Sequence, residues 1–313
     1  MTGSNGFVGR ALCAYLSDLG ISVRSAVRSL ASGGAGAVAV GDIGPDTDWT
    51  GALEDIDSVV HLAARVHMVW DKTHGAEVEY RRINVEATRH LASAAAAQGV
   101  RRFVLLSSAK VNGQRSQRPL TEADTPHPED SYALSKWEAE QALVRVGRET
   151  GMDWVILRPP LVYGPGVRAN FLSLMRAVAA RAPLPFAAID NRRSLLYLGN
   201  LVDAITTCLQ HPHAPGKTFL VSDGEDLSTP DLVRRLAKAL HVPPRLIPVP
   251  SALLSLAAAL TGKRATVDRL VSSFEIDASA IRATLQWTPP FSVDRGLQQT
   301  ADWFLQMERA PAP

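Results

Sequence analysis

Cysteines are scarce in this sequence: Cys13 and Cys208 are the only two among 313 residues, and both lie in apolar, helix-like runs. So few thiols exclude the disulfide framework of a small secreted domain and favour buried, reduced side chains. Long hydrophobic runs are missing as well, because the most apolar late run, residues 252–260, is too short to cross a bilayer. The first residues lack the pattern of a secretory signal. We therefore expect a cytoplasmic protein without a membrane partner.

A surplus of one sign of charge is also absent. The 33 Lys and Arg residues nearly balance 31 Asp and Glu residues, which leaves a net charge of +2. Proteins that bind nucleic acid through its phosphates usually carry a clear basic surplus, so we expect no nucleic-acid partner. The chain is 46% hydrophobic, which gives ample core for one large or two modest domains.

A glycine-rich turn is present at the start of the chain. Gly3, Gly6 and Gly9 are spaced three apart and lead into an amphipathic run that begins at Arg10. This is the pattern of a dinucleotide site, in which a tight turn brings backbone amides close to a pyrophosphate. The strand that should precede the turn is missing, since Met1 stands where its last residue would be. We expect that the natural chain begins several residues earlier or that its start was misassigned.

The second predicted strand, residues 21–28, lacks the Asp or Glu that usually follows it in NAD sites and binds the ribose hydroxyls. Arg28 and Ser29 stand there instead. An arginine can pair with a 2′-phosphate in bidentate fashion, so this position favours NADP. The alternative, a solvated surface arginine, stays open.

Three further predicted strands lead to the same edge of the sheet. Residues 38–43 end in Asp42, which is placed to meet an adenine edge, and residues 58–64 are nearly all apolar, as a strand covered on both faces should be. His61 in this strand is expected to be a packed core histidine. Residues 103–108 end at Ser108, where ligands bind in open parallel sheets.

Tyr132 and Lys136 lie four residues apart at the start of a helix-forming run, and therefore on one face of the helix. An ammonium near a phenol favours the phenolate, so the pair can exchange a proton near neutral pH. Alone, this spacing also fits an ordinary surface pair. Together with the glycine turn and Ser108, it meets the needs of hydride transfer at a secondary alcohol or ketone.

The alternation of strands and helices predicts an α/β fold with a Rossmann-type, doubly wound parallel sheet. We expect a dinucleotide-binding domain at residues 1–160. The strict alternation stops near residue 160, so residues 161–313 are expected to form a smaller mixed α/β substrate lobe, from which about residues 194–222 return to the first domain.

The ordered set of motifs resembles a known family, the extended short-chain dehydrogenases/reductases of the NAD-dependent epimerase/dehydratase type. The motifs that carry the resemblance are Gly3/Gly6/Gly9, His61-Leu62-Ala63-Ala64, Asn84-Val85, Ser107-Ser108, Tyr132/Lys136 and Arg158-Pro159-Pro160-Leu161-Val162-Tyr163-Gly164-Pro165. The resemblance implies that Tyr132 is the acid/base, that Lys136 lowers its pKa, and that Ser108 binds the reacting oxygen. Asn84 is structural rather than catalytic in this pattern.

The resemblance also implies two sets of binding residues. The cofactor set is Gly3, Asn5, Gly6, Phe7, Val8, Gly9, Arg28, Asp42, Ile43, Leu62, Ala63, Ala64, Tyr132, Lys136 and Pro159. Nucleotide-sugar members bind a diphosphate through C-terminal arginines, which gives the substrate set Ser108, Lys110, Asn170, Arg193 and Arg269. A homodimer through the helices at residues 85–98 and 132–147 is a further expectation from the family.

The absence of one further motif limits the reactions that the chain could catalyse. Dehydratases of this family carry an Asp-Glu pair directly after the Ser108 position, where this chain has Ala109 and Lys110. Two reactions remain at C4 of a nucleotide sugar, with UDP as the expected nucleotide: reduction of a 4-keto sugar in surface polysaccharide synthesis, and epimerisation with bound NAD. Arg28 favours NADP and therefore the reductase. A non-catalytic NAD(P)-sensing module and a reductase of small apolar ketones are the remaining alternatives.

Overall fold

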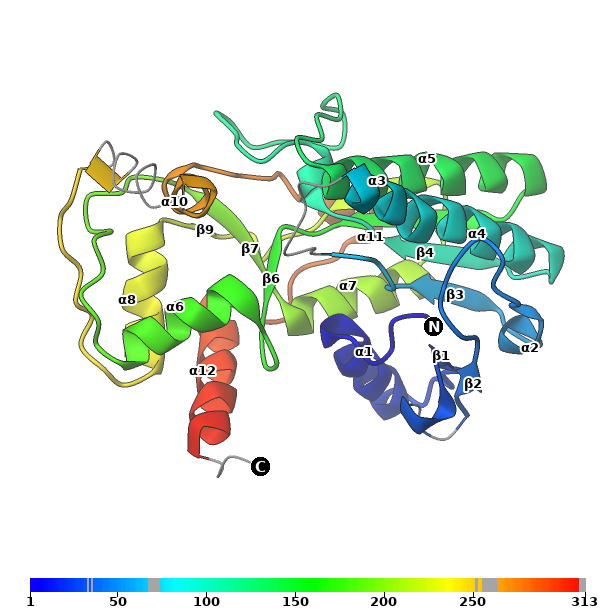
Figure 1. The fold of residues 1–313 in the computed structure, drawn as a ribbon, viewed down its shortest axis with the longest axis horizontal. Helices are drawn as coiled ribbons and strands as arrows, with labels where there is room; N and C mark the ends of the chain where they lie inside the picture. The colour runs from blue at the N-terminus through cyan, green and yellow to red at the C-terminus, as the bar shows by residue number, and fades with distance from the viewer. Residues whose placement is uncertain (33, 35, 67–73, 251–252, 255–263, 310–313) are drawn as a thin grey trace.

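The computed structural model describes residues 1–32, 34, 36–66, 74–250, 253–254 and 264–309. It consists of a larger lobe built on a parallel sheet and a smaller lobe that contains the last described helix (Figure 1). In the described part of the chain, no helix is long and apolar enough to span a bilayer.

The parallel sheet of the larger lobe contains β1 (Ala26–Val27), β2 (Val38–Ala39), β3 (Ser58–His61), β4 (Arg102–Leu106), β5 (Asp153–Arg158) and β8 (Lys217–Leu220). β1 pairs with β2, and the other strands follow in the order β3-β4-β5-β8, all in parallel. Thr2 forms isolated parallel bridges with Ala26 and His61. The residue before the glycine turn therefore lies between β1 and β3. The second predicted strand is shorter than expected, because only Ala26–Val27 of residues 21–28 form a ladder.

Helices cover both faces of this sheet (Figure 1). One face packs against α1 (Phe7–Asp18), α7 (Leu198–Gln210) and α11 (Ser279–Leu285), and the other against α4 (Ala87–Ala97) and α5 (Ser131–Thr150). The strand residues alternate accordingly: Val104 faces the first set of helices, and Phe103 and Leu105 face the second. Apolar side chains on both faces are what a strand buried on two sides requires.

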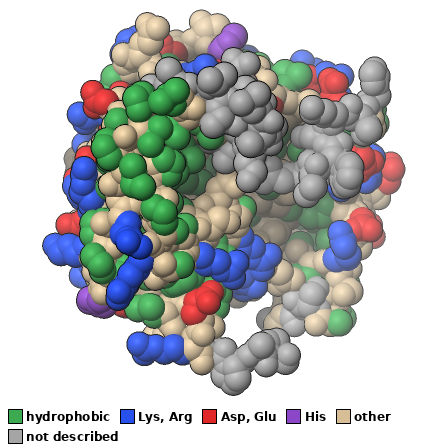
Figure 2. Space-filling view, turned by 60° about the vertical axis from the view of Figure 1, so that its left-hand side comes forward, with side chains coloured by type: hydrophobic (Ala, Val, Ile, Leu, Met, Phe, Trp, Pro, Cys, Tyr) green, Lys and Arg blue, Asp and Glu red, His purple; other side chains and the backbone are tan. Residues whose placement is uncertain are grey.

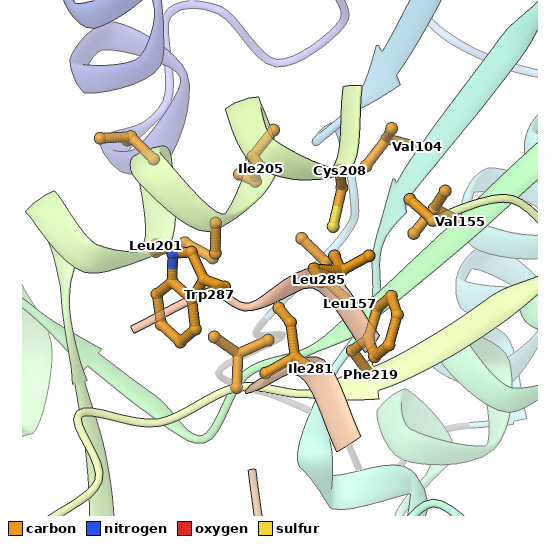
Figure 3. Close-up of a cluster of buried hydrophobic side chains, with 14 of the residues drawn as sticks. Val104, Val155, Leu157, Leu201, Ile205, Cys208, Phe219, Ile281, Leu285 and Trp287 are labelled. Carbon is orange, nitrogen blue, oxygen red and sulfur yellow. The ribbon is translucent and has the colours of Figure 1, made fainter. Parts of the chain in front are cut away.

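The core under α7 and α11 fixes how the C-terminal segment returns to the larger lobe. Ile281, Leu285 and Trp287 pack there against Leu201 and Ile205 of α7 and against strand residues, as Figure 3 shows. The indole nitrogen of Trp287 donates a hydrogen bond to the carboxylate of Asp203, at 2.7 Å. A buried indole needs such a polar partner.

The smaller lobe is built on a second sheet of β6 (Leu161–Tyr163), β7 (Arg193–Tyr197) and β9 (Asp226–Leu227). β6 and β7 are parallel, and β9 is antiparallel to β7. The helices α6 (Ala169–Ala179), α8 (Thr229–Ala239), α10 (Arg264–Val271) and α12 (Val293–Arg309) belong to this lobe. The predicted α/β class, with a parallel sheet and a mixed C-terminal lobe, is confirmed. Phe274 and Ile276 form isolated parallel bridges with Arg193 and Leu120.

Short elements connect these layers. They are the 3₁₀ turns η1 (Leu30–Ser32) and η3 (Ala109–Val111), the short helices α2 (Thr50–Leu53) and α3 (His74–Tyr80), and a π-helical segment, η2 (Arg81–Glu86). η2 continues directly into α4. Single turns of π-helix inside a longer helix are often found at functional sites.

Candidate active site

The glycine turn has the geometry that a dinucleotide requires. Gly3 has φ +70°, and a Cβ atom built on Gly9 would lie 2.1 Å from the carbonyl oxygen of Gly3. In the part of the chain that the structure describes, no side chain caps the start of α1, so the first amides of the helix remain available to a pyrophosphate. The Ser4 hydroxyl in the same turn is buried, and it has no hydrogen-bond partner among the described residues. The residues present therefore fit a dinucleotide, with Asn5, Phe7 and Val8 on the same turn.

The glycine turn also lies against the smaller lobe. The side chain of Phe7 packs against the core of both lobes, and a Cβ atom on Gly166 would lie 3.5 Å from its ring. Gly166 follows β6 in the loop that leads to α6. The glycine turn and the smaller lobe therefore meet at Phe7.

Ser108 and Tyr132 lie together at the carboxyl edge of the parallel sheet. Ser108 caps η3 directly after β4, and its hydroxyl lies close enough to the side chain of Tyr132, in the first turn of α5, to oppose the rise in the pKa of that phenol. The amide of Ala109 donates to the carbonyl oxygen of Pro159, at 2.8 Å, which fixes η3 to the end of β5. The structure thus brings together the two side chains predicted to act on the reacting oxygen.

The electrostatics of Tyr132 differ from the expectation. Burial raises the pKa of Tyr132, the carboxylate of Asp130 and the phenol of Tyr80 raise it further, and the hydrogen bond with Ser108 opposes them. Lys136 is almost completely buried, which lowers the pKa of its ammonium to about 8, although the carboxylate of Glu140 opposes the shift. In this structure desolvation therefore outweighs the predicted lowering of the phenol pKa by Lys136.

Lys110 lies beside Tyr132, and its ammonium is 5.8 Å from the centre of the ring. Nζ of Lys110 also forms an ion pair with Asp130, at 2.8 Å. The other carboxylate oxygen of Asp130 caps α5 by accepting a hydrogen bond from the amide of Ala133, at 2.7 Å. Asp130 thus links a predicted substrate residue to the helix of Tyr132. It was not among the predicted site residues, although a capping aspartate before a helix is a recognisable signal.

A buried ion pair lies one helical turn beyond Lys136. Arg158 donates to both carboxylate oxygens of Glu140, at 3.0 and 2.6 Å, and both side chains are almost completely buried. The hydroxyl of Ser107 also donates to Glu140, and Arg158 donates to the side chain of Asn112, at 3.0 Å. Sequence reasoning missed Glu140. The available signal was a carboxylate four residues after Lys136, on the inner face of the helix.

Two predicted cofactor residues bind each other. Nε of Arg28, just after β1, lies 2.6 Å from a carboxylate oxygen of Asp42, and both side chains are exposed. Ile43 follows Asp42 in the same loop, and Leu62, Ala63 and Ala64 follow β3. These residues lie after neighbouring strands at the edge where a dinucleotide would extend from the glycine turn.

Three of the predicted substrate residues, Asn170, Arg193 and Arg269, lie in the smaller lobe. Arg193, at the start of β7, donates to the carbonyl oxygen of Ser272, at 2.9 Å, and lies over the ring of Phe274. Asn170 is exposed in the first turn of α6. The backbone of Arg269 is part of α10, but its side chain lies outside the described part of the structure. Figure 2 shows Lys and Arg side chains near the middle of one face, beside a large hydrophobic area.

Comparisons with known proteins identify the family. The family model described as "NAD dependent epimerase/dehydratase family" matches residues 1–222. The UDP-glucose 4-epimerase of Vibrio cholerae is 45% identical over 311 residues, which cover 98% of this chain and 95% of that protein. The structure is similar to a short-chain dehydrogenase/reductase superfamily protein from Agrobacterium tumefaciens with bound NAD, with a TM-score of 0.78, 25% identity, and coverage of 98% and 97% of the two chains.

A UDP-glucose 4-epimerase from Thermotoga maritima, solved with UDP-glucose, has the same fold, with a TM-score of 0.78 at 20% identity and 98% coverage of both chains. The predicted family and the predicted enzyme class are confirmed. The chain therefore belongs to the NAD-dependent epimerase/dehydratase family of extended short-chain dehydrogenases/reductases.

Proposed function

We propose that the chain is a 4-epimerase of a UDP-hexose that works with bound NAD. The observation that carries this proposal is the 45% identity to a UDP-glucose 4-epimerase over nearly the full length of both chains. The sequence favoured a 4-keto sugar reductase because of Arg28. The reductase is therefore the second candidate, because the comparisons support the epimerase better.

The site supports this chemistry. In this proposal Tyr132 takes the proton of the sugar C4 hydroxyl as a phenolate and returns it after the 4-keto sugar has rotated, and Ser108 donates a hydrogen bond to the same oxygen. Because burial raises the pKa of the phenol in this structure, the charge of Lys136 must stabilise the phenolate when cofactor and substrate are bound. Lys136, one turn along α5, supplies a buried positive charge beside the pair. When bound, NAD supplies the hydride acceptor and donor.

The Arg28–Asp42 ion pair supports NAD over NADP. A 2′-phosphate bound to the guanidinium of Arg28 would be repelled by the carboxylate of Asp42, because Nε of Arg28 lies 2.6 Å from an oxygen of that carboxylate. Arg28 would also have to leave Asp42 to bind a phosphate in bidentate fashion. Asp42→Asn should therefore improve NADP binding more than NAD binding, and Arg28→Ala should weaken NADP binding most. Calorimetric titration of both cofactors checks this, and equal shifts for the two cofactors would contradict it.

For the substrate, we assign the UDP diphosphate to Arg193, Asn170 and Arg269, and the sugar to Ser108 and Lys110. A guanidinium such as that of Arg193 suits phosphate oxygens. Lys110 lies next to Tyr132, where a sugar hydroxyl must lie. A homodimer through α4 and α5, expected from the family, stays a prediction.

One purification tests the function. We expect protein purified without added cofactor to release NAD, identified by absorbance and mass, and to interconvert UDP-glucose and UDP-galactose. Tyr132→Phe should lower turnover by about 10²- to 10⁴-fold while leaving NAD bound. Tyr15→Phe is the matched control, since its hydroxyl hydrogen-bonds Asp203 on α7, outside the site. An empty site, with NADPH consumed only when a UDP-4-keto sugar is added, would replace the epimerase with the reductase.

A further inference from the structure

A line of buried hydrogen bonds starts beside the glycine turn. The amide of Ala63 donates to the hydroxyl of Thr2, at 3.3 Å, and this hydroxyl lies 2.7 Å from Nδ1 of His61. Nε2 of His61 lies 3.0 Å from the hydroxyl of Thr88, which donates to the main-chain carbonyl of Asn84, at 2.7 Å. Thr2, His61, Thr88 and Asn84 are each at most 2% exposed.

The line continues to the helix of Tyr132. The side-chain amide of Asn84 donates to the hydroxyl of Ser135, at 2.9 Å, and Ser135 donates to the main-chain carbonyl of Tyr132, at 2.8 Å. The same asparagine exchanges hydrogen bonds with the backbone of Arg65, at 2.8 and 3.2 Å. Asn84 lies in the π-helical segment η2, so the irregular turn places its side chain between the loop after β3 and α5.

The direction of these hydrogen bonds is fixed by counting protons. Thr88 has one hydroxyl proton and donates it to Asn84, so Nε2 of His61 must donate to Thr88. Burial lowers the pKa of His61 to about 3, so the ring is neutral and its one proton is on Nε2. Nδ1 then accepts the hydroxyl proton of Thr2, whose oxygen accepts from Ala63.

The line of hydrogen bonds joins the glycine turn to the helix turn that carries Tyr132. Thr2 precedes Gly3, at which a Cβ atom would lie 2.8 Å from the amide nitrogen of Ala63, so the glycine turn is packed against the same loop. At the other end lies the turn that carries Tyr132. We propose that His61 and Thr88 are positioning residues that couple the dinucleotide turn to the proton-transfer helix. This inference rests on the proposed function for its importance to turnover.

A histidine that only fills the core makes a different prediction. His61 packs against Phe103, with 6.0 Å between ring centres, and a purely structural role would affect stability alone. Coupling would instead transmit cofactor binding to α5 through side chains that touch neither the cofactor nor the reacting oxygen. A structural role and a coupling role therefore predict different effects of removing the Thr88 hydroxyl on NAD binding and on α5.

Thr88→Val tests this, because it keeps the shape of the side chain and removes the hydroxyl. Thr206→Val is the matched control: Thr206 is also buried in a helix and also donates to the carbonyl four residues earlier, at 2.8 Å, but it lies in α7, outside the line. NAD affinity is measured by calorimetry. Protection of residues 132–136 from hydrogen exchange is measured with and without NAD.

We expect Thr88→Val to weaken NAD binding by about five- to tenfold and to remove most of the NAD-induced protection in α5, within the usual range of coupling between sites. Thr206→Val should change neither quantity. Thr88→Ser, which keeps the hydroxyl, should restore both. Equal behaviour of Thr88→Val and Thr206→Val would overturn the proposal, and so would a Thr88→Ser variant that behaves like Thr88→Val.

A second variant covers the case in which Thr88→Val does not fold. His61→Asn removes the ring nitrogen that donates to Thr88, so it should give the same loss of NAD-induced protection. Unchanged protection in a folded His61→Asn variant overturns the coupling. Neither readout needs turnover of a sugar. Failure of the epimerase assay with the coupling intact would therefore refute only the proposed function, and loss of the coupling in an active epimerase would refute only the inference.

Discussion

The buried ion pair between Glu140 and Arg158 makes a sharp prediction for Glu140→Gln. The substitution keeps the size of the side chain and removes a carboxylate that accepts three hydrogen bonds, two from Arg158 and one from Ser107. The same helix offers a matched control two residues earlier. Glu138 pairs with Arg81 through the same two kinds of guanidinium nitrogen, but the side chain of Arg81 is 57% exposed, against 4% for that of Arg158.

The loss in free energy of unfolding should be several times larger for Glu140→Gln than for Glu138→Gln. Removing one partner of a buried ion pair leaves an uncompensated charge and costs about 3–5 kcal/mol. Arg158 keeps its hydrogen bond to Asn112, so we expect the lower part of that range, about 3 kcal/mol, for Glu140→Gln. Glu138→Gln removes an exposed pair and should cost about 0–1 kcal/mol. Urea unfolding of both variants at pH 7 measures the difference.

Glu140→Gln should also act on Lys136. The carboxylate of Glu140 opposes the effect of burial, so without it the pKa of Lys136 falls below about 8. Lys136 then loses its charge at a lower pH. The alkaline limb of turnover should move to lower pH in Glu140→Gln and stay in place in Glu138→Gln.

Equal losses of stability in Glu140→Gln and Glu138→Gln would refute the argument from burial. A large loss of stability with an unmoved alkaline limb would leave the ion pair as structural and refute its electrostatic link to Lys136. The pH profile is needed for this distinction because a loss of stability alone does not move a titration.

Three further predictions concern the glycine turn and two buried ionisable groups. Gly9→Ala places Cβ 2.1 Å from a carbonyl oxygen and should abolish NAD binding in calorimetry, whereas Gly51→Ala, with open space around it, should retain binding. Burial lowers the pKa of Lys136 from 10.5 to about 8, so between these pH values Lys136 is protonated in the unfolded chain and neutral in the folded protein. The free energy of unfolding of the wild type should therefore rise with pH in this range, and Lys136→Met should lack that rise. Burial raises the pKa of Asp223 from 3.8 to about 6, so between these pH values Asp223 is protonated in the folded protein and ionised in the unfolded chain. The free energy of unfolding of the wild type should therefore fall as pH rises, and Asp223→Asn should lack that fall in urea titrations.

The parts of the site that lie within one turn or one strand end could be predicted from the sequence. The close approach of Gly9 to the carbonyl oxygen of Gly3 is local, because both residues belong to one turn. Ser108 was predicted from its position after a strand, and the structure brings its hydroxyl to Tyr132. Such features depend on short-range geometry, which the sequence displays directly.

The parts that depend on long-range pairing could not be predicted. Glu140 and Arg158 meet only because α5 packs on β5, and Arg28 meets Asp42 only because β1 and β2 are neighbours. The pKa of Tyr132 was expected to fall, and it rises, because the degree of burial is set by tertiary packing that no local pattern shows. His61 was predicted to be a core residue, but its partners come from segments 59 and 27 residues away.

Both buried networks act on the same helix, on either side of Lys136. Asn84 holds Ser135 just before it, and Arg158 holds Glu140 one turn after it. The turn that carries Tyr132 is therefore fixed from two directions, and a rigid element positions an acid/base better than a loop does. For a 4-epimerase this has a consequence: if the acid/base stays in place, the sugar must present its second face by turning between α5 and the C-terminal lobe. The residues that permit this turning must then lie on the substrate side, where Lys110 is partly exposed beside Tyr132.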